Sequence, residues 1–565
     1  MSSFLFSPGL ILIFGAALVP VLPLVLRRAY LLLLPVICFW YILGLNPGDV
    51  QTFEFMGYQL EPLRVDKLAL VWGYVFSLAA FLGVLFAIHQ DDRVQDVSAL
   101  VYAGSGISAV FAGDLISLFV FWELTAISSV FLIWASRTEA SYRAGVRYLI
   151  IQIGSGVILL AGILFWFADT GSLAFGDIGI ETLAGKLIFI AFGIKCAFPL
   201  LHNWLQDSYP QATPTGTVIL SAFTTKLAVY ALARGYAGTE VLIYIGATMT
   251  AFPIFFAVIE NNLRKVLAYS LNNQLGFMVV GIGIGTPLAL DGTAAHAFCH
   301  ILYKALLFMS MGAVLHRTGT TKASELGGLY KSMPFTATFC TIGAMSISAF
   351  PLFSGFVSKS MILTAAAGDG YWGVWAVLVF ASAGVMEHSG IKIPYFAFFA
   401  HDSGKRPKEA PFNMLLAMGI TAFLCIAIGV YPAPLYAILP YPVDFVPYTT
   451  AHVITQLQLL MFSVLAFIVL IKTGLYPEEK PSTNLDFDWL YRRLLPKFLR
   501  GSGQKIAVAD QHIRSQLLLI VSRVMQTSER WSGFNGTLAR SSTVGSMASY
   551  AVGLLAVFLV LYFIA

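Results

Sequence analysis

The chain has 565 residues, of which 58% are hydrophobic and only 11% are charged. A water-soluble protein of this length needs more polar surface, so the composition excludes a soluble enzyme or a soluble binding domain. The net charge of +5 is explained by membrane topology, and no nucleic-acid-binding motif accompanies it.

Apolar segments of about 20 residues, long enough to cross a bilayer as helices, recur from Leu10 almost to the C-terminus. We predict about sixteen spans, near residues 8–26, 29–45, 66–89, 96–113, 115–135, 148–168, 186–204, 215–235, 240–259, 265–286, 291–316, 336–362, 371–400, 411–431, 456–473 and 546–564. The first segment lacks the flanking features of a signal peptide, so we expect it to be retained. The predicted fold class is all-α, a polytopic membrane bundle of about 14–16 helices.

Basic residues concentrate in the loops after odd-numbered spans, which predicts that both termini face outward. Residues 474–545, before the last span, interleave basic with apolar residues. Helical amphipathic spacing over 506–525 indicates an interfacial or lateral helix on the cytoplasmic face, and we expect Gly501 and Gly503 to interrupt it. The five cysteines have no C-x-x-C spacing, so we predict no metal site.

A short internal repeat links the seventh and twelfth spans. Ala197-Phe198-Pro199-Leu200 recurs as Ala349-Phe350-Pro351-Leu352, five spans later. Because five is an odd number, the second copy is inverted relative to the first. Interrupted segments at corresponding positions of two inverted halves indicate a transport site. The alternative is that a match of four residues arises by chance. We predict helix breaks at Pro199, Pro351 and Gly355.

Several titratable residues lie within the apolar spans, where each buried charge costs at least about 2.5 to 3.5 kcal/mol. They are Glu123, Lys195, Lys226, Lys304 and Lys359. Burial lowers a lysine pKa and a nearby carboxylate raises it, so such residues can take up and release protons. Together they predict a hydrated proton path, whereas pairing or snorkelling is the alternative for each residue alone.

His296, His300 and Lys304 follow one another at intervals of one helical turn. They therefore share a helix face and form a candidate proton relay.

Two further groups are candidates for the inlet or outlet of the path. His202 and Asp207 follow the predicted break in the seventh span, where the alternative is helix capping. Glu387, His388 and Lys392 lie near the end of the thirteenth span, where the alternative for Lys392 is a place at the membrane interface.

The sequence contains no P-loop, no dinucleotide-binding glycine motif, no metalloprotease motif and no Ser-His-Asp arrangement. We therefore predict no cofactor, and we do not expect the isolated chain to be an enzyme.

Five segments together resemble one protein family: FVFWELTAISSVFLIW, GIKCAFPLLHNWLQDSYPQATPTG, RKVLAYSLNNQLGF, HAFCHILYKALLF and SAFPLFSGFVSK. This is the antiporter-like subunit family, which includes the L, M and N subunits of NADH:quinone oxidoreductase (respiratory complex I) and the large subunits of Mrp-type sodium/proton antiporters. The resemblance covers roughly residues 60–400 and is nearest to the D subunit of the Mrp-type complexes. Beyond residue 474 the chain is more similar to the lateral-helix extension of the L subunit.

The resemblance implies a helical bundle with two inverted five-helix repeats. The implied division is 1–95 (N-terminal helices), 96–239 (first repeat), 240–400 (second repeat), 401–473 (C-terminal helices), 474–545 (lateral segment) and 546–565 (final helix). It also assigns the family's relay to residues already selected by their burial in apolar spans: Glu123, Lys195, Lys226, His300, Lys304 and Lys359.

The function implied is proton translocation by one subunit of a multisubunit Mrp-type cation/proton antiporter, with H⁺ and Na⁺ as candidate ions and other membrane subunits as partners. The expected location is a bacterial inner (plasma) membrane. Two alternatives stay open: a proton-pumping subunit of a complex I-like oxidoreductase or membrane-bound hydrogenase, and a proton-coupled subunit of an inorganic-carbon uptake complex.

Overall fold

The computed structural model describes residues 5–481, 484–538, 540 and 543–564. These form two compact units, one ending at Asn484 and the other beginning at Leu485.

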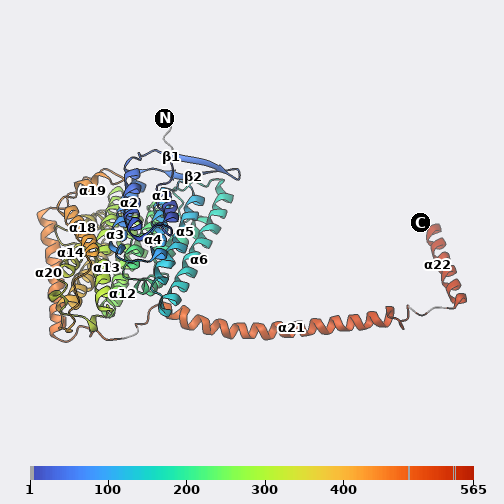
Figure 1. Cartoon of the computed structure of the whole chain (residues 1–565). Helices are drawn as coiled ribbons and strands as arrows, with labels where there is room; N and C mark the ends of the chain where they lie inside the picture. Colours follow the sequence, from blue (N-terminus) through green and yellow to red (C-terminus); the bar gives the residue numbers. More distant parts are fainter. Residues whose placement is uncertain (1–4, 482–483, 539, 541–542, 565) are drawn as a thin grey trace. The chain divides into compact units, whose positions relative to one another are not determined.

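The first unit is a helical bundle with one two-stranded sheet (Figure 1). Its N-terminal elements are α1 (Leu10–Gly15), η1 (Ala16–Leu18), α2 (Leu24–Leu43), β1 (Val50–Phe55), β2 (Tyr58–Arg64) and α3 (Lys67–Ala87). The next are α4 (Arg93–Phe111), α5 (Leu115–Trp134), α6 (Glu139–Thr170), α7 (Leu183–Cys196), α8 (Asn203–Ser208), η2 (Tyr209–Gln211), α9 (Gly216–Leu220) and α10 (Thr224–Gly235).

The second half of this unit contains α11 (Val241–Ile259), α12 (Leu263–Ile284), α13 (Pro287–Thr318), η3 (Ala323–Glu325), η4 (Leu329–Lys331), α14 (Pro334–Ile347), α15 (Ser354–Gly368) and α16 (Trp372–Val385). It continues with η5 (Met386–Ile391), α17 (Lys392–Pro394), η6 (Tyr395–Phe399), α18 (Phe412–Val430), α19 (Ala433–Ala437) and α20 (Thr450–Lys472). The second unit contains η7 (Leu490–Leu494), α21 (Leu495–Ser532) and α22 (Val544–Ile564).

The predicted all-α membrane fold is confirmed. Within the described residues, twelve helices are long and apolar enough to cross a membrane. The predicted seventh and twelfth spans are each divided between shorter helices. The predicted tenth span, α12, is long enough, but its Asn272, Asn273 and Gln274 make it less apolar.

Helix α13 forms the centre of the first unit. It packs against α3, α12, α14, α15 and α18, and nearly all its side chains from Ala289 to Val314 are buried. A helix segment buried on every side cannot expose its polar residues to water, so the titratable groups of α13 between Ala289 and Val314 lie within the protein.

The N-terminal region differs from the sequence prediction. The predicted span 8–26 ends as a helix at Leu18, and α2 begins at Leu24, because Pro20 and Pro23 lie between them. The sequence analysis also missed the hairpin of β1 and β2, which lies across one end of the bundle in Figure 1. Its two-residue turn, Met56-Gly57, has φ values of 53° and 81°, the left-handed backbone of a tight hairpin turn.

In the second unit, α21 is one helix of 38 residues, so the prediction that Gly501 and Gly503 interrupt it is wrong. A glycine costs about 1 kcal/mol relative to alanine inside a helix, which a long helix tolerates. The predicted helical amphipathic segment and the final apolar helix are both present.

Candidate functional site

The predicted residues of the first half meet between α5, α6 and α7. Lys195, in the last turn of α7, is fully buried. Its Nζ donates to the Trp122 carbonyl oxygen at 2.5 Å and to Thr125 Oγ1 at 3.1 Å, both on α5. The ammonium also lies 4.4 Å from the centroid of the Trp122 ring, a favourable place for a cation.

Glu123 lies one residue after Trp122 and interacts electrostatically with Lys195. Its Oε1 is buried and has no hydrogen-bond partner among the described residues. The carboxylate reaches into a space that exists because residue 156 of α6 is a glycine: a Cβ there would overlap Glu123 Oε1. Gly156 is thus part of the site, and sequence analysis did not identify it.

Both predicted helix breaks are present and have the same backbone geometry. Ala197 and Leu200 have φ values of 61° and 71°, and Ala349 and Leu352 have 57° and 74°. In each copy the phenylalanine N–H donates to the carbonyl five residues earlier at 3.0 Å, from Phe198 to Gly193 and from Phe350 to Met345. The four-residue sequence match therefore reflects a repeated structure.

Lys226 and Lys359 bind carbonyl oxygens that helix interruptions leave free. Lys226 Nζ donates to the Ser221 carbonyl at 2.6 Å, at the C-terminus of α9. Lys359 Nζ donates to the carbonyl of Ile347, the last residue of α14, at 3.0 Å. The C-terminus of a helix carries partial negative charge, so each broken helix helps to hold a buried ammonium group.

Gly355 permits this geometry in the second break. A Cβ at Gly355 would overlap the Ser346 carbonyl oxygen, so the glycine lets α15 approach the end of α14. The predicted position of Gly355 at the helix break therefore has a steric basis.

The three predicted residues of α13 are all fully buried. The His296 and His300 rings have centroids 6.2 Å apart. His296 Nδ1 is 3.1 Å from Ser358 Oγ, next to Lys359 in sequence. Neither ring nitrogen of His300 has a hydrogen-bond partner among the described residues. The shared face is present, but no direct hydrogen bond joins these two histidines.

Lys304 connects α13 to α12 and onward to η5. Its Nζ donates to Ser270 Oγ at 2.9 Å. Ser389 Oγ donates to Ser270 Oγ at 2.7 Å, and His388 Nδ1 lies 2.8 Å from Ser389 Oγ. Sequence analysis missed both serines, because serine is an ordinary residue inside membrane helices.

Lys392 is fully buried and forms a 2.8 Å ion pair with Glu479. Glu387 Oε1 is also buried and has no hydrogen-bond partner in the described part of the chain. These two residues and His388 lie on or beside η5, a π-helical turn of a kind found frequently at functional sites.

The other predicted inlet or outlet pair is placed differently. The His202 ring packs against Phe252, with centroids 4.6 Å apart. Asp207 accepts two hydrogen bonds from Arg147, at 2.7 and 3.0 Å. Arg147 thus holds Asp207 in a salt bridge between α6 and α8.

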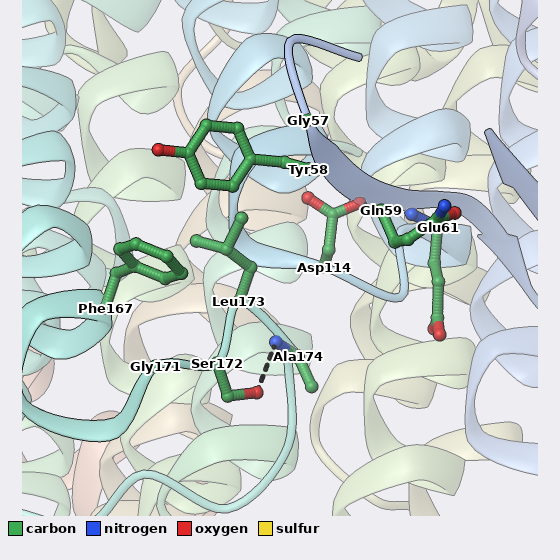
Figure 2. A pocket seen from close by; sticks show the side chains of 10 residues that line it. All are labelled: Gly57, Tyr58, Gln59, Glu61, Asp114, Phe167, Gly171, Ser172, Leu173 and Ala174. Carbon is green, nitrogen blue, oxygen red and sulfur yellow. Dashed lines mark hydrogen bonds between the residues drawn. The ribbon is translucent and has the colours of Figure 1, made fainter. Parts of the chain in front are cut away.

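A separate surface pocket lies beneath the hairpin (Figure 2). It is lined by Tyr58 and Glu61 of β2, by Asp114 and by residues 171–174. Asp114 caps α5 by accepting from the Ser117 N–H at 2.7 Å. None of the predicted relay residues lines this pocket.

Comparison with known proteins gives the family. Residues 112–385 match the family described as NADH:quinone oxidoreductase/Mrp antiporter, TM. The chain is 29% identical over 357 residues to the D subunit of the Na⁺/H⁺ antiporter of Alkalihalophilus pseudofirmus, covering 59% of this chain and 72% of that one. It is 31% identical over 351 residues to the N subunit of the NADH-quinone oxidoreductase of Desulforudis audaxviator, covering 57% and 69%.

Among solved structures, the Mrp complex from Dietzia sp. DQ12-45-1b contains a similar fold, with a TM-score of 0.79 and 24% identity. The match covers 92% of this chain and 62% of that one. The sequence and fold matches agree with the resemblance seen in the motifs. The chain belongs to the NADH:quinone oxidoreductase/Mrp antiporter transmembrane family.

Proposed function

We propose that this chain is the proton-translocating subunit of a multisubunit, Mrp-type cation/proton antiporter. The observation that carries the proposal is a series of fully buried lysines and histidines inside a chain of this family: Lys195, Lys226, His296, His300, Lys304 and Lys359. Such residues are costly in a membrane protein and mark ion or proton pathways. The similarity to a subunit of an Na⁺/H⁺ antiporter makes Na⁺ the first candidate for the coupled cation.

Protons would move along this series by changes of partner. The Glu123 carboxylate stabilises the charged form of Lys195, and its movement would release the proton. Lys226 interacts electrostatically with His300, which in turn interacts with Lys304. Glu123 and His300 have buried polar atoms that lack a protein partner in the described part of the chain. We expect ordered water at these atoms to complete a proton wire.

We further propose that residues 96–239 and 240–400 are the two inverted repeats, each with one access route. The matching backbone of the breaks at Pro199 and Pro351 supports this division. We place the chain in a bacterial plasma membrane with both termini outside, on the distribution of basic residues among the loops.

A second candidate function is proton pumping within a redox-driven complex. The 31% identity to a subunit of an NADH-quinone oxidoreductase favours it. Purification of the native complex separates the two: co-purifying flavin or iron–sulfur subunits indicate the redox-driven pump, and small hydrophobic antiporter subunits indicate the antiporter.

The proposal is tested with Glu123→Gln and Lys195→Met in the complete complex, reconstituted in liposomes. We expect at least about tenfold slower cation-driven proton flux for each variant, because removing a positioned proton carrier typically costs 10²- to 10⁴-fold. Glu139→Gln is the matched control, since Glu139 is exposed and pairs with Arg143 one turn away. Unchanged flux in both site variants would refute the proposal.

A further inference from the structure

A buried ion pair joins α17, which directly follows η5, to the segment that follows α20. The Lys392 side chain is fully buried and that of Glu479 is 6% exposed, with 2.8 Å between Nζ and Oε1. Lys392 Nζ also donates to the Ala257 and Val258 carbonyls, at 3.2 and 2.5 Å, near the C-terminus of α11. Glu479 lies outside any regular helix. Burying a carboxylate costs desolvation energy, and a loop that only connects two elements has no need to bury one.

The segment that carries Glu479 is held in place by aromatic packing. The Tyr476 ring lies against Phe396 and Phe467, with centroid distances of 6.1 and 5.2 Å, and Tyr476 itself is buried. The position of Glu479 against Lys392 is therefore fixed by packing of the residues around it.

On its inner side, Lys392 of this ion pair interacts electrostatically with His388, the end of the hydrogen-bonded series that begins at Lys304. That series passes through Ser270 and Ser389 to His388 Nδ1, with no step longer than 2.9 Å. His388 is fully buried, and its Nε2 has no hydrogen-bond partner among the described residues. His388 interacts electrostatically with Lys392, one helical turn further along the chain.

On its outer side, Glu479 interacts electrostatically with Glu260, just after α11. Glu260 forms a 2.9 Å ion pair with Lys265, whose side chain is 29% exposed. Titratable groups thus continue from the fully buried interior to a residue that reaches solvent.

We propose that Glu479 carries protons as the outer carboxylate of an outlet that runs from Lys304, through Ser270, Ser389 and His388, to the surface near Lys265. This inference rests on the proposed function and adds a residue and a route to it. Glu387, Lys392, Glu260 and Tyr476 are the other titratable groups around Glu479.

Each step transfers one proton. The Ser389 hydroxyl, which donates to Ser270 in this structure, first turns toward His388 Nδ1, and the Ser270 hydroxyl turns toward Ser389. The Lys304 ammonium then passes a proton to Ser270 as the Ser270 hydroxyl proton moves to Ser389 and the Ser389 proton moves to His388 Nδ1. The imidazolium then loses its Nε2 proton to the Glu479 carboxylate, either directly or by way of Glu387, which interacts electrostatically with Glu479, and Glu479 releases the proton to water. Burial raises the pKa of the Glu479 carboxyl, and Lys392 opposes that rise, so the group is suited to both steps.

The test compares Glu479→Gln, Glu479→Asp and Glu478→Gln in the complete reconstituted complex. Glu479→Gln should slow proton flux at least about tenfold, and Glu479→Asp should restore part of it, since only the aspartate can carry a proton. Glu478→Gln should match the wild type, because that neighbouring side chain is 73% exposed.

The alternative is that Glu479 only neutralises Lys392. The double variant Glu479→Gln/Lys392→Met removes both charges, so it should restore flux under that alternative and remain slow under ours. It also tests the inference if Glu479→Gln alone does not assemble, because it leaves no unpaired lysine. Restored flux, or wild-type flux in Glu479→Gln, would overturn the inference. Slow flux in Glu123→Gln at the same time would show that the proposed function itself stands.

Discussion

At the residue scale, the buried lysines share one mode of binding: each ammonium group lies on backbone carbonyl oxygens. Lys226 and Lys359 use carbonyls at helix interruptions, and Lys392 uses those near the end of α11. At Lys226 and Lys359 the carbonyl oxygens hold the ammonium without a full negative charge, whereas Lys392 also pairs with the Glu479 carboxylate.

Lys359→Arg should abolish transport although it preserves the charge. The guanidinium stays protonated at neutral pH, so it cannot release a proton. We expect at least about tenfold slower flux in proteoliposomes. Lys322→Arg, at an exposed lysine paired with Glu325, is the control. Full activity of Lys359→Arg would show that the site needs only a fixed charge.

Gly156→Ala tests the position of Glu123. A Cβ at residue 156 would overlap Glu123 Oε1, whereas a Cβ at Gly154, on the same helix, meets no atom within 4 Å. Gly156→Ala should therefore reduce flux by about 10²-fold, the cost of misplacing a catalytic group by about 1 Å, and Gly154→Ala should not. If the two variants transport protons equally fast, transport does not depend on the position that the Glu123 carboxylate has in this structure.

Sequence reasoning found the residues whose charge is unexpected in an apolar span and missed those whose type is common there. Glu123, Lys195 and Lys359 belong to the first class. Gly156 and Ser389 belong to the second, because small residues are frequent in membrane helices and only the three-dimensional contacts show their role. Glu479 was missed for a third reason, since it lies in a polar stretch where charges are ordinary.

At the element scale, the two interrupted helices were predictable because proline cannot donate the hydrogen bond of a continuing helix. The prolines did not reveal that two non-glycine residues around each break adopt positive φ, at Ala197 and Leu200 and again at Ala349 and Leu352. Such backbone costs about 1–3 kcal/mol per residue and persists where the surrounding packing enforces it. Its repetition at both breaks indicates that the break itself is a functional element.

Gly355→Ala should destabilise the second break. Its Cβ would overlap the Ser346 carbonyl oxygen, while Gly368, at the other end of α15, has open space. Overpacking typically costs about 1–3 kcal/mol, so the purified complex should unfold at a lower temperature than wild type, and Gly368→Ala should unfold close to it. Equal melting temperatures would show that α14 and α15 can separate freely.

At the scale of the whole molecule, the first unit has its own extensive core, and the second has no buried residue among those described in α21 and α22. Apolar side chains such as Leu517, Leu518 and Ile520 are half exposed or more on α21. Unburied apolar surface of this extent marks contact with lipid or with other proteins. The amphipathic pattern of α21 was predictable from the sequence.

Ending the chain at Asn484 tests whether the second unit braces the assembly. The shortened chain keeps every residue of the proposed path, including Glu479, and the compact unit that contains them. We expect it to insert in the membrane but to lose neighbouring subunits, because α21 and α22 carry apolar side chains and have no buried residue among those described. Native electrophoresis of gently solubilised membranes should show smaller complexes, whereas Arg514→Gln, at an exposed side chain paired within α21, should leave their size unchanged. A full-sized complex with the shortened chain would mean that the first unit alone holds the assembly together.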